Sequence, residues 1–170
     1  EAQFAPSEVR VGRDGYVDPD QRRSLIFAGA LGELRKRFRT AIDLRKEDLF
    51  AGTGTTPFEV SNYEIELAAH RDGCFFSAHL DTMTYRSREG ITSDRLISAV
   101  YYFHRQPKAF SGGGLAIYPF GQGEPELIEP GDNRLVGFPS ITVHEVLPVS
   151  CPEHQFSNAR VSSNFWLRRA

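Results

Sequence analysis

Two side chains that could bind a metal, His79 and Asp81, are separated by one residue in the stretch Ser77–Thr82. Side chains two apart in an extended strand point to the same side, so this imidazole and this carboxylate can reach one cation together. The preceding run, Cys74–Ala78, is short and partly apolar, as expected of a half-buried strand. Alone, a His-x-Asp pair is also typical of an ordinary polar strand end, so a metal site needs a third ligand.

His144 is the best candidate for that third ligand. Two imidazoles and one carboxylate on one face of a metal leave three coordination positions open, as in mononuclear non-haem Fe(II) sites. A lone histidine is more often a satisfied polar group or a surface residue, so His144 gains weight only together with His79 and Asp81. We predict that these three side chains form a metal centre and that this centre is catalytic.

The composition is that of an ordinary globular domain. The chain has 170 residues, enough for one domain with a real core, with 40% hydrophobic and 25% charged residues and a formal net charge of -2. No broad basic field points to nucleic acid, and no apolar run is long enough to cross a bilayer. Two cysteines do not make a disulfide framework. We expect a cytoplasmic monomer or homodimer without nucleic-acid or membrane partners.

The order of patterns along the chain predicts one helical region followed by many short strands. Residues 1–17 are expected to form an edge strand or an ordered arm. Asp18 and Pro19 suit a helix start, and apolar residues then recur at every third or fourth position as far as Ile42. Turn signals separate eight strand candidates at residues 58–69, 74–80, 96–103, 115–119, 126–129, 134–138, 142–149 and 161–167.

This arrangement predicts a single, mainly β domain, a sandwich or barrel with a helical layer. Residues 1–57 would be the N-terminal arm and supporting helix, and residues 58–170 the β core. Two loops, residues 46–56 and 83–94, are expected to shape a substrate site, because loops on a rigid barrel commonly carry specificity.

Four pieces of the sequence occur in an order that is itself informative. They are His79-Leu80-Asp81, Arg95–Phe103, Ser111–Leu115, and His144–Pro148 followed by Arg160–Trp166. Together they resemble the Fe(II)/2-oxoglutarate-dependent dioxygenases, and within these the prolyl hydroxylase group that includes the hypoxia-factor and bacterial prolyl hydroxylases. The match runs from about Phe58 to the end of the chain. The resemblance implies a double-stranded β-helix, a cupin-like jelly roll, in agreement with the strand pattern.

The resemblance also implies roles for individual residues. His79, Asp81 and His144 would hold Fe(II), and Arg160 would hold the C5 carboxylate of 2-oxoglutarate, since a guanidinium can donate two parallel hydrogen bonds to a carboxylate. Tyr102 would form a hydrogen bond with the tail of 2-oxoglutarate. A one-residue slip in strand register would give this role to Tyr101 instead. The hypoxia-factor enzymes have a second tyrosine in the cosubstrate pocket, on the strand before the His-x-Asp motif. Ungapped counting places Ala69 at that position, so this tyrosine contact is expected to be absent here. The complete set of expected cosubstrate contacts is Arg160, Tyr102, Ser162, Leu115 and Val146.

The implied reaction hydroxylates an unactivated C–H bond and releases succinate and CO2, with ascorbate as reductant. Asp81 stands where related halogenases have a small residue, which predicts hydroxylation or desaturation. The leading substrate hypothesis is a prolyl residue of a protein or peptide, with Arg86, Arg88 and Trp166 as candidate substrate contacts. The alternatives are a small molecule or free amino acid, a cupin-like Zn or Mn enzyme that does not use 2-oxoglutarate, and a non-catalytic jelly-roll binding module.

Overall fold

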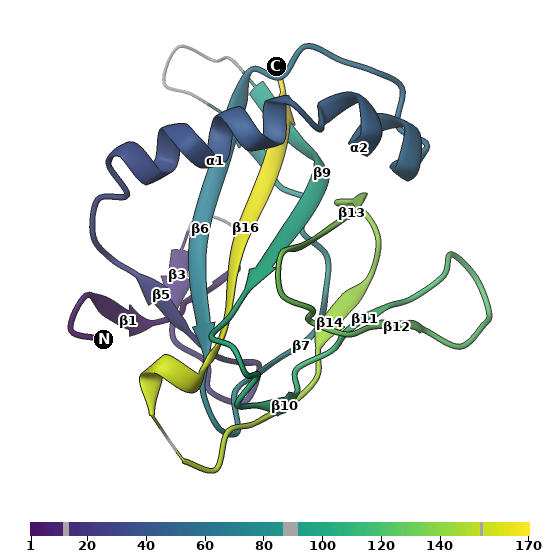
Figure 1. Ribbon diagram of the computed structural model, residues 1–170. Helices are drawn as coiled ribbons and strands as arrows, with labels where there is room; N and C mark the ends of the chain where they lie inside the picture. Colours follow the sequence, from purple (N-terminus) through teal and green to yellow (C-terminus); the bar gives the residue numbers. More distant parts are fainter. Residues whose placement is uncertain (12–13, 87–91, 154) are drawn as a thin grey trace.

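The protein, described by a computed structural model over residues 1–11, 14–86, 92–153 and 155–170, is mainly β (Figure 1). Its helices are α1 (Glu33–Asp43), α2 (Lys46–Thr53) and the short 3-10 helix η1 (Phe156–Asn158). Its strands are β1 (Phe4–Pro6), β2 (Val9–Val11), β3 (Asp14–Tyr16), β4 (Arg22–Arg23), β5 (Leu25–Phe27), β6 (Asn62–His70), β7 (Phe75–His79), β8 (Thr84–Arg86), β9 (Thr92–Phe103), β10 (Ser111–Gly112), β11 (Leu115–Ile117), β12 (Glu126–Ile128), β13 (Arg134–Pro139), β14 (His144–Val146), β15 (Val149–Ser150) and β16 (Arg160–Arg169).

Two antiparallel sheets hold most of these strands. The larger sheet has seven strands in the order β1-β5-β6-β16-β9-β13, with β8 paired to β9. The smaller sheet has five strands in the order β12-β11-β14-β7-β4. An apolar cluster joins the inner faces of the two sheets, because Leu115 and Ile128 of the smaller sheet pack with Phe138 of the larger one.

The eight predicted strand regions are all confirmed, with boundaries that differ by a few residues. Residues 142–149 form two strands, β14 and β15, rather than one. Pro148 lies in the break, and proline has no N–H to donate to a β ladder. The predicted edge strand in residues 1–17 is β1, which lies at one edge of the larger sheet.

The strand β16 lies between β6 and β9 in the middle of the larger sheet, and its two faces differ in chemistry. Phe165 and Leu167, at 1% and 0% exposure, point into an apolar cluster on the outer face. Arg160 and Ser162, two residues apart, line a cavity on the inner face. The period of two along a strand therefore separates core side chains from site side chains.

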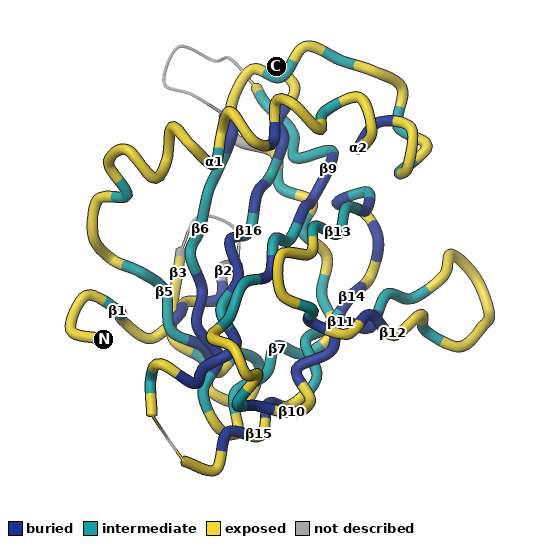
Figure 2. Tube along the Cα trace, viewed as in Figure 1, coloured by how far each residue is buried: buried dark blue, intermediate teal, exposed yellow. Residues whose placement is uncertain are grey.

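Both helices pack on the outer face of the larger sheet, where Figure 1 shows α1 crossing β6 and β16. Figure 2 shows α1 exposed along most of its length. The buried residue of this helix is Ile42. At the α2 contact, a Cβ on Gly137 would lie 2.4 Å from Leu49 Cδ2, so a larger residue here would require the Leu49 side chain to shift. The buried members of this outer cluster are Ile42, Leu49, Phe50, Tyr63, Ile97, Ala99, Phe165 and Leu167.

Two predictions about the first third of the chain are wrong. The helix does not begin at Asp18, because residues 22–27 form β4 and β5, which pair with β7 and β6. Asp18 Oδ1 instead accepts a hydrogen bond from the backbone N–H of Asp20, so the residue stabilises a turn rather than a helix start. The predicted substrate loop at residues 46–56 is mostly helix α2, which faces the apolar cluster and lines no part of the cavity.

The helices in the described part of the chain are all too short and too polar to cross a membrane.

The packing of α1 can be tested with a matched pair of substitutions. Ile42→Ala should lower the free energy of unfolding by about 2–5 kcal/mol, because it removes a buried aliphatic side chain between α1 and the sheet. Leu44→Ala, at a position 77% exposed, should change it by less than about 0.5 kcal/mol. Urea unfolding followed by circular dichroism measures both. Equal, small losses would show that α1 does not pack on the sheet in solution.

Candidate metal centre

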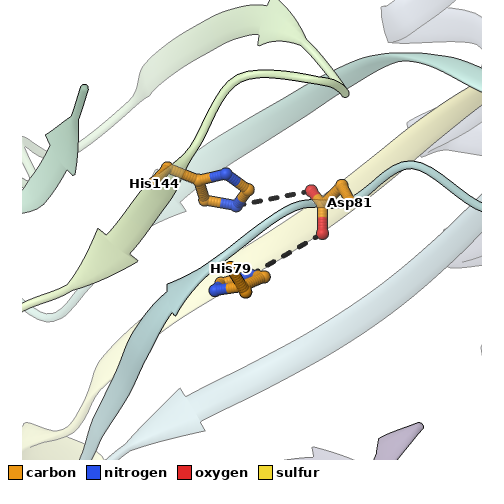
Figure 3. Close-up of side chains that lie close together, drawn as sticks. All are labelled: His79, Asp81 and His144. Carbon is orange, nitrogen blue, oxygen red and sulfur yellow. Dashed lines mark ion pairs between the residues drawn. The ribbon is translucent and has the colours of Figure 1, made fainter. Parts of the chain in front are cut away.

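His79, Asp81 and His144 converge at the inner face of the smaller sheet (Figure 3). One ligand atom from each lies within 4.8 Å of the others. Asp81 Oδ1 is 3.7 Å from His79 Nε2, and Asp81 Oδ2 is 3.5 Å from His144 Nε2. The antiparallel pairing of β14 with β7 sets His144 directly opposite His79, and Asp81 follows two residues after the end of β7.

Each histidine of this cluster is oriented by a backbone carbonyl. His79 Nδ1 lies 2.7 Å from the carbonyl oxygen of Ser77, and His144 Nδ1 lies 2.9 Å from that of Thr142. A carbonyl oxygen only accepts, so each Nδ1 carries the proton and each Nε2 keeps its lone pair. Both lone pairs are therefore available on the side of the ring that faces Asp81, as metal ligation requires.

The pKa values of the cluster favour the forms that bind metals. Burial, together with the nearby His144, lowers the pKa of His79 to about 4, although Asp81 acts in the opposite direction. Burial raises the pKa of Asp81, but the two histidines and the nearby side chains of Trp166 and Ser98 together bring it below its usual value. At neutral pH His79 is thus uncharged and Asp81 is a carboxylate, so metal binding displaces no proton from either.

Neighbouring side chains hold the three candidate ligands in place. Phe76 stacks on His79 with ring centroids 3.5 Å apart and an interplanar angle of 16°. Ser98, which is 1% exposed, donates a hydrogen bond of 2.7 Å to Asp81 Oδ2. Ser140 lies 3.0 Å from Ser98 through the two hydroxyl oxygens, and its backbone carbonyl accepts from Asp81 N–H. The carboxylate is therefore fixed through both its side chain and its backbone.

The cluster opens into a cavity of about 480 Å³ between the two sheets. This volume is in the range of small-molecule sites. The cavity is lined by most of the side chains that the sequence singled out for chemistry, namely His79, Asp81, His144, Arg160, Tyr102, Ser162, Leu115, Val146 and Trp166. The cross-strand pair formed by Leu115 and Val146 supplies apolar wall on the side of the smaller sheet.

Arg160 is the first residue of β16 and is 1% exposed. Its Nε donates a 2.8 Å hydrogen bond to the carbonyl oxygen of Gly113, and its Nη1 lies 3.2 Å from His70 Nδ1. A Cβ on Gly113 would lie 2.6 Å from Arg160 Cδ, and the residue has a φ of +68°, so glycine is required here. Among the described residues, no carboxylate forms an ion pair with Arg160.

Tyr102 rather than Tyr101 faces this arginine. The Tyr102 ring lies 4.9 Å from Arg160 Cζ, and the residue is 0% exposed. Burial raises the pKa of Tyr102 despite the nearby Arg160, and the hydroxyl proton of Tyr102 has no acceptor among the described residues. Tyr101 points the other way, and its hydroxyl donates to Asn133 Oδ1. The β9 register thus decides between the two alternatives that the sequence left open.

The structure describes the other residues around the site to different extents. Arg168 is 2% exposed and bound to Glu64. Arg88 lies outside the described residues, and Arg86 is described only as backbone of β8. Ala69 is buried at 0% exposure, and it is the next residue, His70, that lines the cavity.

Three residues of the site were missed from the sequence. Ser98 shares a face of β9 with Tyr102, so alternation along the strand from Tyr102 could have identified Ser98. Gly113 lies in the Ser111–Leu115 segment, where glycine by itself indicates only a turn. His70 directly follows a predicted strand, and no local signal shows that β16 covers it.

Comparisons with known proteins identify the family of this chain. Residues 60–168 match the model of a family described as the 2OG-Fe(II) oxygenase superfamily. An uncharacterized PKHD-type hydroxylase of Synechocystis sp. is 33% identical over 158 residues, covering 85% of this chain and 49% of that protein. The chain thus spans about half the length of the curated relative that it matches.

Solved structures show the same fold. A prolyl-4-hydroxylase from Pseudomonas putida superposes with a TM-score of 0.66 at 25% identity, covering 99% of this chain and 79% of that one. A prolyl hydroxylase from Trichoplax adhaerens, in complex with a peptide fragment of the hypoxia inducible factor oxygen degradation domain, gives a TM-score of 0.65 at 21% identity, covering 97% and 70%.

The support that Ser98 gives to Asp81 can be tested by metal titration. Ser98→Ala should weaken Mn(II) binding about 10- to 100-fold, because hydrogen-bond partners of metal ligands typically contribute that much to affinity. Ser61→Ala, which changes an exposed serine remote from the cluster, should leave Mn(II) affinity unchanged. Isothermal titration calorimetry with Mn(II) distinguishes the two. Unchanged affinity in Ser98→Ala would rule out a role for this hydrogen bond in ligand placement.

Proposed function

Because the chain belongs to the 2OG-Fe(II) oxygenase superfamily, we propose that it is a prolyl hydroxylase-like enzyme that uses Fe(II) and 2-oxoglutarate. His79, Asp81 and His144 would hold the iron, and Arg160 would hold the distal carboxylate of 2-oxoglutarate. The two sheets would be the two halves of a double-stranded β-helix, in a single domain whose N-terminal arm and helices support the β core. Ascorbate would serve as reductant.

The observation that carries this proposal is the buried charge of Arg160. A guanidinium stays protonated in proteins, and burial of an uncompensated charge is costly. Burial lowers the pKa of Arg160, and no acidic side chain of the described chain compensates its charge. A ligand carboxylate would supply the missing counter-charge, and this cavity is the one that also contains the three candidate metal ligands.

The other groups near Arg160 suit a carboxylate as well. The Tyr102 hydroxyl is buried and its proton has no acceptor in the described structure, so it is free to donate to a ligand oxygen. Ser162 lies on the same face of β16 as Arg160 and lines the same cavity. Leu115 and Val146 offer apolar contact to the methylene carbons between the two ends of 2-oxoglutarate. The site therefore fits a short chain with an acid at its far end.

The bound groups would supply the oxidation, in which O2 converts 2-oxoglutarate to succinate and CO2 and adds one oxygen atom to a substrate C–H bond. The residues of the chain bind and orient. The imidazoles of His79 and His144 and the carboxylate of Asp81 would form one face of the metal site. Arg160 and Tyr102 fix the far end of the cosubstrate, and Leu115 with Val146 limits the access of water.

We propose a prolyl residue of a protein or peptide as the substrate. Support comes from structural relatives that are prolyl hydroxylases, one of them solved with a peptide. Trp166 is the candidate contact for this substrate, because its indole lies at the cavity wall with the Arg95 guanidinium 4.1 Å from its ring centroid. Fold alone is a weak guide to substrate, so the test must include small molecules.

The central test is oxygen transfer by the wild-type protein and by a ligand variant. With Fe(II), ascorbate and 2-oxoglutarate, wild-type protein should add one oxygen to a proline-containing peptide and form an equal amount of succinate, both measured by mass spectrometry. Asp81→Ala removes the carboxylate ligand and should abolish both products. Asp20→Ala, whose side chain is 94% exposed, should retain them.

Turnover that persists in Asp81→Ala would refute the metal centre. Oxygen gain in free proline or another small molecule, but in no peptide, would refute the peptide substrate while leaving the enzyme class intact.

The anchoring role of Arg160 predicts a selective defect. Arg160→Gln should raise the 2-oxoglutarate concentration needed for half-maximal succinate formation by about 10- to 100-fold, since a hydrogen-bonded charge contributes about 1.5–3 kcal/mol. The Fe(II) requirement should change much less. Arg169→Gln, at the exposed end of the same strand, is the control, and thermal unfolding checks that both variants fold. An unchanged 2-oxoglutarate requirement in folded Arg160→Gln would place the anchor elsewhere.

A further inference from the structure

The deep end of the cavity contains a buried histidine that has no part in the roles assigned so far. His70 is the last residue of β6, is 3% exposed, and lies directly opposite Arg160 on β16. It lines the same cavity as Arg160 and Tyr102. It belongs to neither the metal cluster nor the apolar core.

The contact with Arg160 fixes the tautomer of this ring. Arg160 Nη1 lies 3.2 Å from His70 Nδ1, and a guanidinium has donors only, so Nδ1 must be the acceptor. A neutral imidazole that accepts at Nδ1 carries its proton on Nε2. The doubly protonated ring is disfavoured, because burial and the charges of Arg160 and Arg22 hold the pKa of His70 well below its usual value.

The Nε2–H group of His70 is therefore a donor, and it is buried with no acceptor among the described residues. A buried donor without an acceptor is destabilising, so such a group in a residue that lines a cavity indicates a missing ligand atom. The Arg160 guanidinium contacts the His70 ring. The Tyr102 ring lies 4.9 Å from Arg160 Cζ, and the Tyr102 hydroxyl proton also lacks an acceptor among the described residues. Several donors and no carboxylate at one end of a cavity match a ligand group that only accepts.

We propose that His70 is a positioning residue that donates its Nε2–H to the distal carboxylate of 2-oxoglutarate, while its Nδ1 holds the Arg160 guanidinium in place. The inference rests on the proposed function and adds a residue to it. One imidazole then serves both partners of the ion pair, accepting from the cation and donating to the anion. His70 makes the site selective for a 2-oxoacid that ends in a carboxylate.

The test compares two ligands of equal chain length that differ only at the far end. 2-Oxoglutarate has the distal carboxylate, and 2-oxopentanoate has a methyl group there. Binding to the Mn(II)-loaded protein is measured by calorimetry, without turnover. His70→Phe should weaken 2-oxoglutarate binding about tenfold or more, the value of one hydrogen bond to a charged group, and leave 2-oxopentanoate binding unchanged. His70→Gln, which keeps an acceptor and a donor, should recover part of the loss.

Two controls separate this role from a structural one. His104→Phe changes a histidine that packs against Phe110 outside the cavity lining, and it should alter neither affinity. Mn(II) affinity and the melting temperature should match the wild type in every variant that is compared. Equal weakening of both ligands in His70→Phe, or no weakening of either, would overturn the role of His70. A wild-type protein that binds 2-oxoglutarate no better than 2-oxopentanoate would overturn the proposed function itself, and the His70 inference with it.

Discussion

The central position of β16 is the constraint on which the rest of the structure depends. Its backbone is paired on both sides, with β6 and with β9, so its register cannot slip by one residue without exchanging its two faces. Such a slip would turn Arg160 and Ser162 toward the helices and Phe165 toward the cavity. The burial of Phe165 and Leu167 under α1 and α2 opposes it. Apolar packing on the outside of the sheet therefore fixes the positions of polar groups on its inside.

How much of the fold and of the site could be predicted from the sequence depends on how far apart in the chain the interacting residues lie. The strands and the pairing of His79 with Asp81 follow from local alternation, and all eight predicted strand regions exist. The helix expected from Asp18 failed because β5 pairs with β6, a partner some forty residues away that no local pattern reveals. His70 was missed for the same reason, since only the pairing of β6 with β16 places it beside Arg160. Long-range strand partners decide what short-range periodicity leaves open.

The two ends of the cavity are built on different physical principles. At the metal end, the carbonyl oxygens of Ser77 and Thr142 orient imidazoles whose Nε2 atoms face Asp81, and Asp81 supplies a negative charge. At the deep end, the groups that face the cavity are donors, and the charge is the cation of Arg160. A ligand that joins the two ends must be able to coordinate a metal at one end and be anionic at the other.

Most of the other guanidinium groups around the cavity are paired with a carboxylate, and this determines which way a charged ligand would lie. Glu64 binds both Arg95 and Arg168; burial raises its pKa, but these two guanidinium groups bring it below the usual value. Arg22 forms a 2.8 Å ion pair with Glu66. In the described part of the cavity wall, Arg160 is thus the buried guanidinium that has no carboxylate partner. The binding free energy of a dicarboxylate that is also a 2-oxoacid is most favourable when its far carboxylate reaches this arginine. Its 2-oxoacid end then faces the metal ligands.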